Sequence, residues 1–256
     1  MSARLLTDAP GVTLLAVTSV AVSATARALA LSQRRMRFAE ALFLSDQPPP
    51  ADTPAEWRPI APITSRHAYS RFMLHDLAAQ LRTDHVLCVQ WDGYVLDPAG
   101  WDPTFLDYDY IGAPWPHFDD AMTVGNGGFS LRSRRLVAAC ATLPVPDEAE
   151  DVAICRTHRH MLETRFGLRF APEDVARRFA FERAAPTGTE FGFHGAFNMI
   201  GRVPSLELAA MLRALEPGLL NRREHREMLH AASRRGDARL AAVLWRRMRH
   251  PAARRR

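Results

Sequence analysis

The order of elements in the first 45 residues constrains the fold more than any other feature of the sequence. Residues 12–17 are all apolar except Thr13, as expected of a strand that is buried on both faces. Alanine, leucine and arginine then recur at helical spacing over residues 19–39, and a second apolar run follows at 38–44. Strand, helix and strand in this order predict the opening of a doubly wound α/β sheet.

Residues 85–90, His-Val-Leu-Cys-Val-Gln, form the clearest predicted strand of the chain. An amphipathic helix over 65–81 precedes it, and the polar stretch Trp91-Asp92-Gly93 follows it directly. Ligands of open α/β sheets bind beyond the carboxyl ends of the strands. Asp92 is therefore placed where a ligand is expected.

The remaining elements complete one α/β domain and a helical extension. Helices are expected at 133–143 and 150–166, closing elements at 175–182, 191–194 and 197–200, and helices from 205 onward. We expect a mixed, mostly parallel sheet with flanking helices over residues 1–204, and a basic helical C-terminal extension over residues 205–256.

Composition excludes some classes of protein. With 256 residues and 47% hydrophobic content the chain can bury a large core. Its net charge is +5, and the positive excess is concentrated in residues 222–256. A nucleic-acid-binding domain spreads or stripes its charge over the folded surface, so we expect no nucleic-acid partner. A basic scaffold that acts through this tail remains an alternative.

Cysteine usage and the N-terminal segment bear on location. Cys88, Cys140 and Cys155 have no metal-ligand spacing, which predicts buried thiols in a reducing, cytoplasmic compartment. Residues 11–31 resemble a secretion signal, but threonine and serine interrupt the apolar run, and a strand and helix are expected there instead. The sequence has no run of about 18 consecutive apolar residues, so we expect no membrane span.

Four short motifs contain candidate functional residues, and each has a structural alternative. Asp92 fits a ligand of a divalent ion, or a turn before Gly93. The stretch 125–128, Gly-Asn-Gly-Gly, allows close approach of a ligand, or forms a simple tight turn. Glu150-Asp151 supplies a general base or caps a helix, and the tripeptide Glu-Asp-Val recurs at 173–175.

His194 is the fourth candidate. It is flanked by Gly192 and Gly195 and by three phenylalanines at 191, 193 and 197. Such a histidine is either a core residue or a ligand.

Taken in order, the four motifs resemble those of the GT-A class of glycosyltransferases, and more closely a bacterial family of glycosyltransferase-like proteins. The strings that carry the resemblance are Gln90-Trp91-Asp92-Gly93, Val-Gly-Asn-Gly-Gly-Phe-Ser-Leu-Arg at 124–132, Glu150-Asp151-Val152 and Phe-Gly-Phe-His-Gly at 191–195. The similar region extends over about residues 12–203. The resemblance implies a GT-A, Rossmann-like fold.

The resemblance also implies a role for each position. Asp92 corresponds to the second acid of an Asp-x-Asp metal motif, whose first acid is replaced by Gln90, and His194 would complete a site for Mn²⁺ or Mg²⁺. Asp151 corresponds to the general base of inverting relatives, with Glu150 as its neighbour toward the acceptor. The remaining residues implied in binding the nucleotide sugar or the acceptor are Thr18, Ser19, Asp46, Gln90, Trp91, Gly93, Asn126, Gly127 and Gly128.

The resemblance therefore implies a hexosyltransferase that uses a nucleotide sugar and a glycan or lipid-linked acceptor in bacterial cell-surface polysaccharide synthesis. An inactive sugar-nucleotide or glycan-binding module is the alternative, because Gln90 replaces an acid. In the C-terminal extension, apolar residues and arginines alternate over 239–249. This basic helix either lies on anionic lipid at the inner face of the cytoplasmic membrane, packs on the domain, or packs on a second copy in a homodimer.

Overall fold

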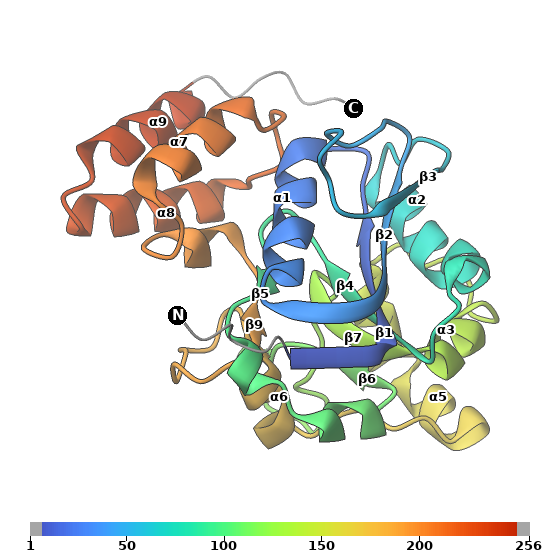
Figure 1. The fold of residues 1–256 in the computed structure, drawn as a ribbon. Coiled ribbons are helices and arrows are strands. Elements are labelled where there is room, and N and C mark those ends of the chain that lie inside the picture. Colours follow the sequence, from blue (N-terminus) through green and yellow to red (C-terminus); the bar gives the residue numbers. More distant parts are fainter. Residues whose placement is uncertain (1–6, 250–256) are drawn as a thin grey trace. The chain divides into compact units, whose positions relative to one another are not determined.

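A computed structural model describes residues 7–249, and its centre is a six-stranded sheet (Figure 1). The strands are β1 (Thr7–Val17), β2 (Met36–Ser45), β3 (Glu56–Pro59), β4 (His85–Val89), β6 (Tyr110–Ile111) and β7 (Phe129–Ser133). Their order is β3-β2-β1-β4-β7-β6, and the first four are parallel to one another. Only β7 is antiparallel to its neighbours β4 and β6. The predicted mixed, mostly parallel sheet is confirmed.

Helices cover both faces of this sheet because the side chains of its strands alternate between two cores (Figure 1). Leu14 and Ala16 of β1 belong to the core beneath α1 (Val22–Gln33) and α6 (Glu173–Phe179). Leu15 and Val17 point the other way, into the core shared with α3 (Arg134–Cys140) and with the segment that begins at α2 (Arg66–Arg71). The result is the three-layer arrangement expected of an α/β domain.

The expected helices have shorter or less regular bounds than the sequence indicates. The helix expected over 19–39 is α1, which ends at Gln33 because the chain enters β2 at Met36 and pairs with β1. After α2 the chain continues as a π-helical turn (Phe72–Asp76) and a 3₁₀ turn (Leu77–Gln80). The helix expected over 150–166 consists of α4 (Glu150–Val152), a π-helical turn (Ala153–Thr157) and α5 (Arg159–Phe166).

A second, three-stranded sheet contains part of the motif at 191–195. It consists of β5 (Tyr94–Val95), β9 (Gly192–Phe193) and β8 (Ala180–Phe181) in that spatial order. β9 pairs antiparallel with β5 and parallel with β8. Since β5 begins two residues after Asp92, this sheet ties the segment around His194 to the segment that follows β4.

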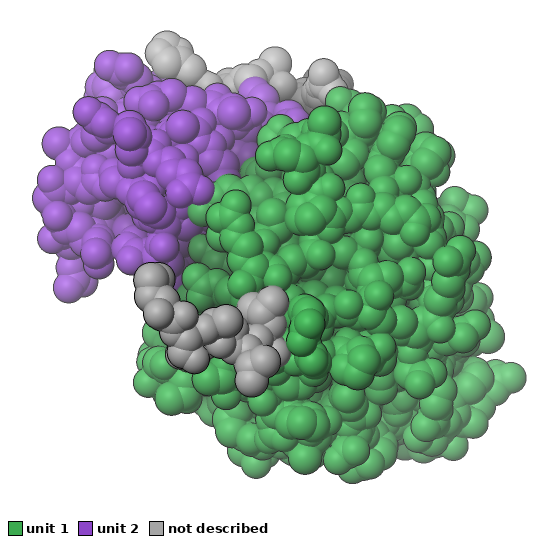
Figure 2. Space-filling view, viewed as in Figure 1, with its two compact units in different colours: residues 1–194 green, residues 195–256 purple. Residues whose placement is uncertain are grey.

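The chain forms two compact units, residues 1–194 and residues 195–256 (Figure 2). The second unit contains a 3₁₀ turn (Ala196–Met199) and the helices α7 (Ser205–Ala214), α8 (Arg222–Arg234) and α9 (Ala238–Arg249). The units separate ten residues before the expected boundary at 204. Asn221 begins α8 with a capping box formed with Glu224.

Two further expectations concern cysteines and membranes. All three cysteines are free and buried, as predicted for structural thiols. Among residues 7–249, no helix is both long enough and apolar enough to cross a bilayer. Residues 12–17 and 24–26, within the signal-like segment, lie in β1 and α1 and are buried there.

Candidate functional site

Several candidate residues lie at one edge of the large sheet, where its parallel strands end. The parallel strands β1, β2 and β4 end at the same edge, so Thr18 and Ser19, Asp46, and Gln90 follow them there. β7 is antiparallel and therefore starts at this edge, with Phe129 opposite Val89 of β4. This register places the glycine-rich loop 125–128 beside the residues that follow β4.

Asp92 and His194 form the centre of the site. Oδ1 of Asp92 lies 3.3 Å from Nε2 of His194, and the two side chains are 8% and 17% exposed. Oδ1 of Asp92 is buried and accepts no hydrogen bond of good geometry from any described residue. Gly93 is packed against the ring, because a Cβ at this position would lie 3.2 Å from Cδ2 of His194 and 2.8 Å from the carbonyl oxygen of Phe193.

Asn126 connects the loop to His194. Its φ of 70° is unusual for a residue other than glycine, although asparagine tolerates this region better than most residues. Nδ2 of Asn126 lies 3.2 Å from Nδ1 of His194, while Oδ1 accepts the N–H groups of Gly128 and Phe129 at 3.2 and 3.3 Å. The asparagine side chain therefore holds the loop through Oδ1, and its amide nitrogen lies beside the imidazole.

Gly128 cannot be another residue without moving the imidazole. A Cβ at this position would lie 2.1 Å from Nε2 of His194 and 2.5 Å from Cε1. The loop 125–128 therefore packs against the ring of His194 as well as forming a turn. The sequence alone did not show this role.

Glu182 is a site residue that sequence reasoning missed. It follows β8 just as His194 follows β9, and Phe181 pairs with Phe193, so the two side chains emerge together. Oε1 of Glu182 lies 3.6 Å from Nδ1 of His194. Burial lowers the pKa of His194, but Asp92 and Glu182 outweigh it and raise this pKa well above its ordinary value. The imidazole is therefore positively charged at neutral pH.

Asp151 touches the same loop from the other side. Its Oδ2 accepts the N–H of Gly127 at 2.8 Å, and its Oδ1 accepts the N–H of Val152 at 2.9 Å. Burial, and next the nearby charge of Glu150, raise the pKa of Asp151 to about 6. The two backbone hydrogen bonds act in the opposite direction and limit the rise.

Glu150 faces the interior of the domain. Its Oε1 accepts a hydrogen bond of 2.8 Å from Arg132, and the two side chains are 6% and 1% exposed. Arg132 also donates to Oγ of Ser130 at 3.0 Å and lies over the ring of Tyr110. A Cβ on Gly127 would come within 2.4 Å of Oε1 of Glu150, so this ion pair directly supports the loop. Sequence reasoning placed Glu150 toward an acceptor and did not single out the role of Arg132.

The other candidates share the edge on neighbouring segments. Nε2 of Gln90 donates to the hydroxyl of Tyr69 at 3.2 Å, and Trp91 is half-buried. Oγ of Ser19 accepts the N–H of Ile63 at 2.8 Å, whereas the hydroxyl of Thr18 bonds the backbone of Val20.

Asp46 is the last candidate of this edge. Its Oδ1 is buried and has no hydrogen-bond partner among residues 7–249. An acceptor left unpaired in this way is unfavourable unless a ligand or water supplies a donor.

The fit to a divalent ion depends on two side chains. Within the described chain, no group of three or more His, Cys, Asp or Glu side chains is arranged to hold a metal. The 3.3 Å between Asp92 and His194 is nevertheless close to the spacing of adjacent ligands around an octahedral ion, about 3 Å. Mg²⁺ is usually bound through one or two carboxylates together with substrate phosphates. Asp92 and His194 together can supply two ligands to a divalent ion once His194 has lost its proton.

Residues 56–194 match the model of a family described as "Protein of unknown function (DUF5672)". The chain belongs to this family. The DUF5672 segment begins at β3 and ends at His194, so it contains Asp92, the glycine-rich loop, Asp151 and Glu182, but not Thr18, Ser19 or Asp46. No curated protein matches the sequence.

Solved structures of glycosyltransferases are similar to this DUF5672 protein in arrangement. The mannosyltransferase PcManGT from Pyrobaculum calidifontis, in complex with GDP-Man and Mn²⁺, is 13% identical, with 93% of this chain and 74% of that chain covered and a TM-score of 0.44. A glycosyltransferase involved in glycosylation of the major capsid of PBCV-1 is 11% identical, with 72% and 93% covered and a TM-score of 0.40. The galactosyltransferase LgtC, in complex with donor and acceptor sugar analogs, is 10% identical, with 84% and 99% covered and a TM-score of 0.39. All three TM-scores lie below 0.5, a level at which a shared activity does not follow.

Proposed function

We propose that this protein is a glycosyltransferase of the GT-A type. It moves a hexose from a nucleotide sugar to a hydroxyl group of a glycan or lipid-linked acceptor. One observation carries the proposal. A single loop at the carboxyl edge of the sheet contacts Asp151 through the N–H of Gly127 and contacts His194, the partner of Asp92, at Asn126 and Gly128. This arrangement separates a base from a cluster suited to a diphosphate.

Asp151 is the proposed general base. An acceptor hydroxyl must lose its proton as its oxygen attacks the anomeric carbon, and a nearby carboxylate can take that proton. With a pKa of about 6, Asp151 is mostly ionised at neutral pH and is still a better proton acceptor than an ordinary aspartate. The hydrogen bonds from Gly127 and Val152 fix the orientation of the carboxylate.

Asp92 and His194 are the proposed donor-side residues. When bound there, Mn²⁺ or Mg²⁺ would neutralise the negative charge that develops on the departing diphosphate. Glu182 pairs with the imidazole at Nδ1, so that Nε2 points to Asp92. The role that hydrogen-bond partners play for ligating histidines elsewhere supports this assignment.

The proposed reaction is a single displacement that inverts the anomeric carbon. The bond between the acceptor oxygen and the anomeric carbon forms as the bond between the anomeric carbon and the diphosphate breaks, and the hydroxyl proton passes to Asp151. Asp151 contacts the loop at Gly127, whereas His194, the partner of Asp92, contacts it at Gly128; a single displacement requires the base and the leaving group to lie on opposite sides of the sugar. Buried and paired, Glu150 and Arg132 are positioning residues in this scheme.

Replacing Asp151 by Asn tests the proposal. Asp151→Asn should abolish transfer from nucleotide sugars and leave nucleotide binding nearly unchanged, because the amide cannot accept the proton. The chain supplies a matched control in its second Glu-Asp-Val string, where Asp174 is exposed at the start of α6. Asp174→Asn should keep full turnover. Equal turnover of wild type and Asp151→Asn would remove Asp151 from the mechanism.

A second candidate function is an inactive module that binds a sugar nucleotide or glycan. The bond from Gln90 to Tyr69 favours it, because the position of a first metal-binding acid holds a neutral amide that is already engaged. A thermal-shift screen of nucleotide sugars, with and without Mn²⁺, combined with an assay for released nucleotide, separates the two functions. Stabilisation without any release of nucleotide would favour the binding module.

The second unit suggests where the enzyme works. Leu240, Val243 and Leu244 of α9 are buried within this unit, whereas Trp245 and Met248 are 47% and 37% exposed. We propose that the exposed arginines of α9 and Trp245 bring a cytoplasmic enzyme to anionic lipid at the inner face of the membrane. The free cysteines fit a reducing compartment. A homodimer formed through α9 is the alternative.

A further inference from the structure

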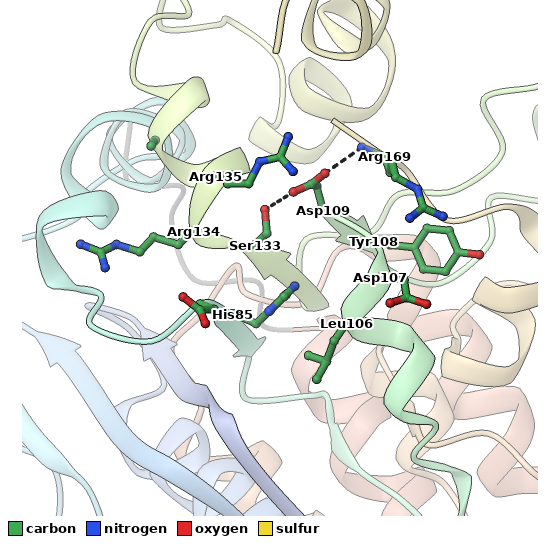
Figure 3. A pocket seen from close by; sticks show the side chains of 11 residues that line it. His85, Leu106, Asp107, Tyr108, Asp109, Ser133, Arg134, Arg135 and Arg169 are labelled. Atoms are coloured by element: carbon green, nitrogen blue, oxygen red, sulfur yellow. Dashed lines mark hydrogen bonds between the residues drawn. The ribbon is translucent and has the colours of Figure 1, made fainter. Parts of the chain in front are cut away.

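A hollow lies at the edge of the sheet opposite the proposed transfer site. It has a volume of about 500 Å³, within the range of small-molecule sites, roughly 300–1,000 Å³. His85, at the start of β4, and Ser133, at the end of β7, belong to its wall (Figure 3). Nothing in the proposed reaction uses this hollow.

Opposite charges are balanced around the hollow. Three arginines, at 134, 135 and 169, and three aspartates, at 84, 107 and 109, contribute to its lining. Burial lowers the pKa of His85, so the imidazole is neutral at pH 7. A strongly anionic ligand would be attracted by the arginines and repelled by the carboxylates. The lining therefore favours an uncharged ligand.

Some of these groups are already engaged. Asp109 accepts hydrogen bonds from the Ser133 hydroxyl and from the N–H of Arg169 (Figure 3). The guanidinium of Arg135 donates to the carbonyl oxygens of residues 166 and 167. The guanidinium of Arg169 lies over the ring of Tyr108. These contacts hold the wall of the hollow in place.

Other groups are available to a ligand. In the described part of the chain, the side chains of Arg134, Asp84 and Asp107 form no hydrogen bond or ion pair, and Arg134 and Asp107 are exposed. In Figure 3, Arg134 and Arg169 lie on opposite sides of His85. Donors and acceptors thus both line the hollow, beside the apolar surfaces of Leu106 and Ala138.

We propose that this hollow is a second saccharide-binding site, which holds a neutral sugar unit of a glycan away from the proposed transfer site. A sugar hydroxyl both donates and accepts hydrogen bonds, so different hydroxyls of one sugar unit can pair with Arg134 and with Asp107. The C–H groups of a sugar ring can cover Leu106 and Ala138. The inference rests on the proposed function, because a glycan acceptor is what gives such a site its purpose.

The two sites are separate in space. β4 and β7 each have five residues, and the hollow and the transfer site lie at opposite ends of both strands. Five residues of a strand span roughly 13 Å between the first and the last Cα. One sugar unit cannot contact both sites. Changes at one site should therefore leave binding at the other intact.

A glycan array that carries neutral oligosaccharides beside sialylated and phosphorylated ones tests the inference. We expect the full chain to retain neutral oligosaccharides, and Arg134→Ala and Asp107→Asn each to weaken that retention at least tenfold. Both variants should fold, since neither side chain has a hydrogen-bond partner to lose within residues 7–249. Arg34→Ala is the matched control, since Arg34 is an exposed arginine of the same unit without such a partner.

The outcomes distinguish this site from the transfer site. Asp92→Asn should retain neutral glycans as the wild type does, even if transfer is never detected, so a failure of the proposed enzyme activity does not by itself remove the second site. Three results would overturn the inference. They are no retention of any neutral glycan, retention of charged glycans only, and retention that Asp92→Asn abolishes while Arg134→Ala and Asp107→Asn leave it unchanged.

Discussion

Gly128→Ala tests the contact between the loop and the imidazole. The new Cβ would lie 2.1 Å from Nε2 of His194, and ordinary contacts begin at 3.4 Å. The ring must therefore retreat by about 1.3 Å, or the loop must shift by as much. Either movement exceeds what the 3.3 Å contact with Asp92 and the 3.2 Å contact with Asn126 can tolerate.

The expected cost of Gly128→Ala has two parts. Overpacking of this kind destabilises proteins by about 1–3 kcal/mol. For a unit of this size that corresponds to a fall in Tm of roughly 2–12 °C. A displacement of about 1 Å in a catalytic group lowers turnover roughly 100-fold. Urea unfolding measures the first part, and release of nucleotide from a nucleotide sugar measures the second.

Gly11→Ala is the control for this prediction. A Cβ on Gly11 would meet no atom within 4 Å, and the backbone there has no positive φ. This variant should keep its stability and turnover. If Gly128→Ala also matched the wild type in both measurements, the loop would not hold His194, and the site as described would be wrong.

Three further predictions concern the buried ion pair, the base and the basic helix. Arg132→Met should lower the free energy of unfolding, measured in urea, by about 3–5 kcal/mol, because it leaves Glu150 buried and unpaired. Adding Glu150→Gln should recover part of this loss. A double variant no more stable than the single variant would contradict the pairing. Because the pKa of Asp151 is raised from 3.8 to about 6, the folded state binds the Asp151 proton more tightly than the unfolded state, so the free energy of unfolding should fall by about 3 kcal/mol as pH rises from below 4 to above 6. Asp151→Asn should lose this part of the pH dependence, and turnover of the wild type should rise over the same pH interval. Identical pH profiles of stability for the wild type and Asp151→Asn would refute the pKa shift. Arg246→Ala combined with Arg249→Ala should weaken flotation with phosphatidylserine liposomes about 30-fold, at about 1 kcal/mol per arginine, and an unchanged flotation would exclude the lipid contact.

The strands were the most predictable part of the fold. Residues 12–17 and 85–90 are apolar runs with clear ends, and they form the adjacent central strands β1 and β4. The helix over 65–81 was predictable in position but not in form, because its π-helical turn depends on packing against the sheet. The two-residue strands β8 and β9 have too few residues to show any periodicity.

The candidate site was predictable where a motif follows a strand. Asp92 and His194 lie within ion-pair distance, and Asp151 contacts the loop 125–128 at Gly127. Their roles remain predictions. Glu182 escaped notice because it meets His194 only through the pairing of β8 with β9. Arg132 escaped notice because a fully buried arginine is rare, and its carboxylate partner Glu150 comes from α4, 18 residues further along the chain.

The most direct measurement is a structure of the protein with Mn²⁺ and the nucleotide sugar that gives the largest thermal shift. We expect the diphosphate to lie beside Asp92 and His194, with the anomeric carbon between it and the carboxylate of Asp151. A nucleotide bound elsewhere, in the hollow at Arg134 for example, or a thermal-shift screen in which no nucleotide sugar stabilises the protein, would contradict the account.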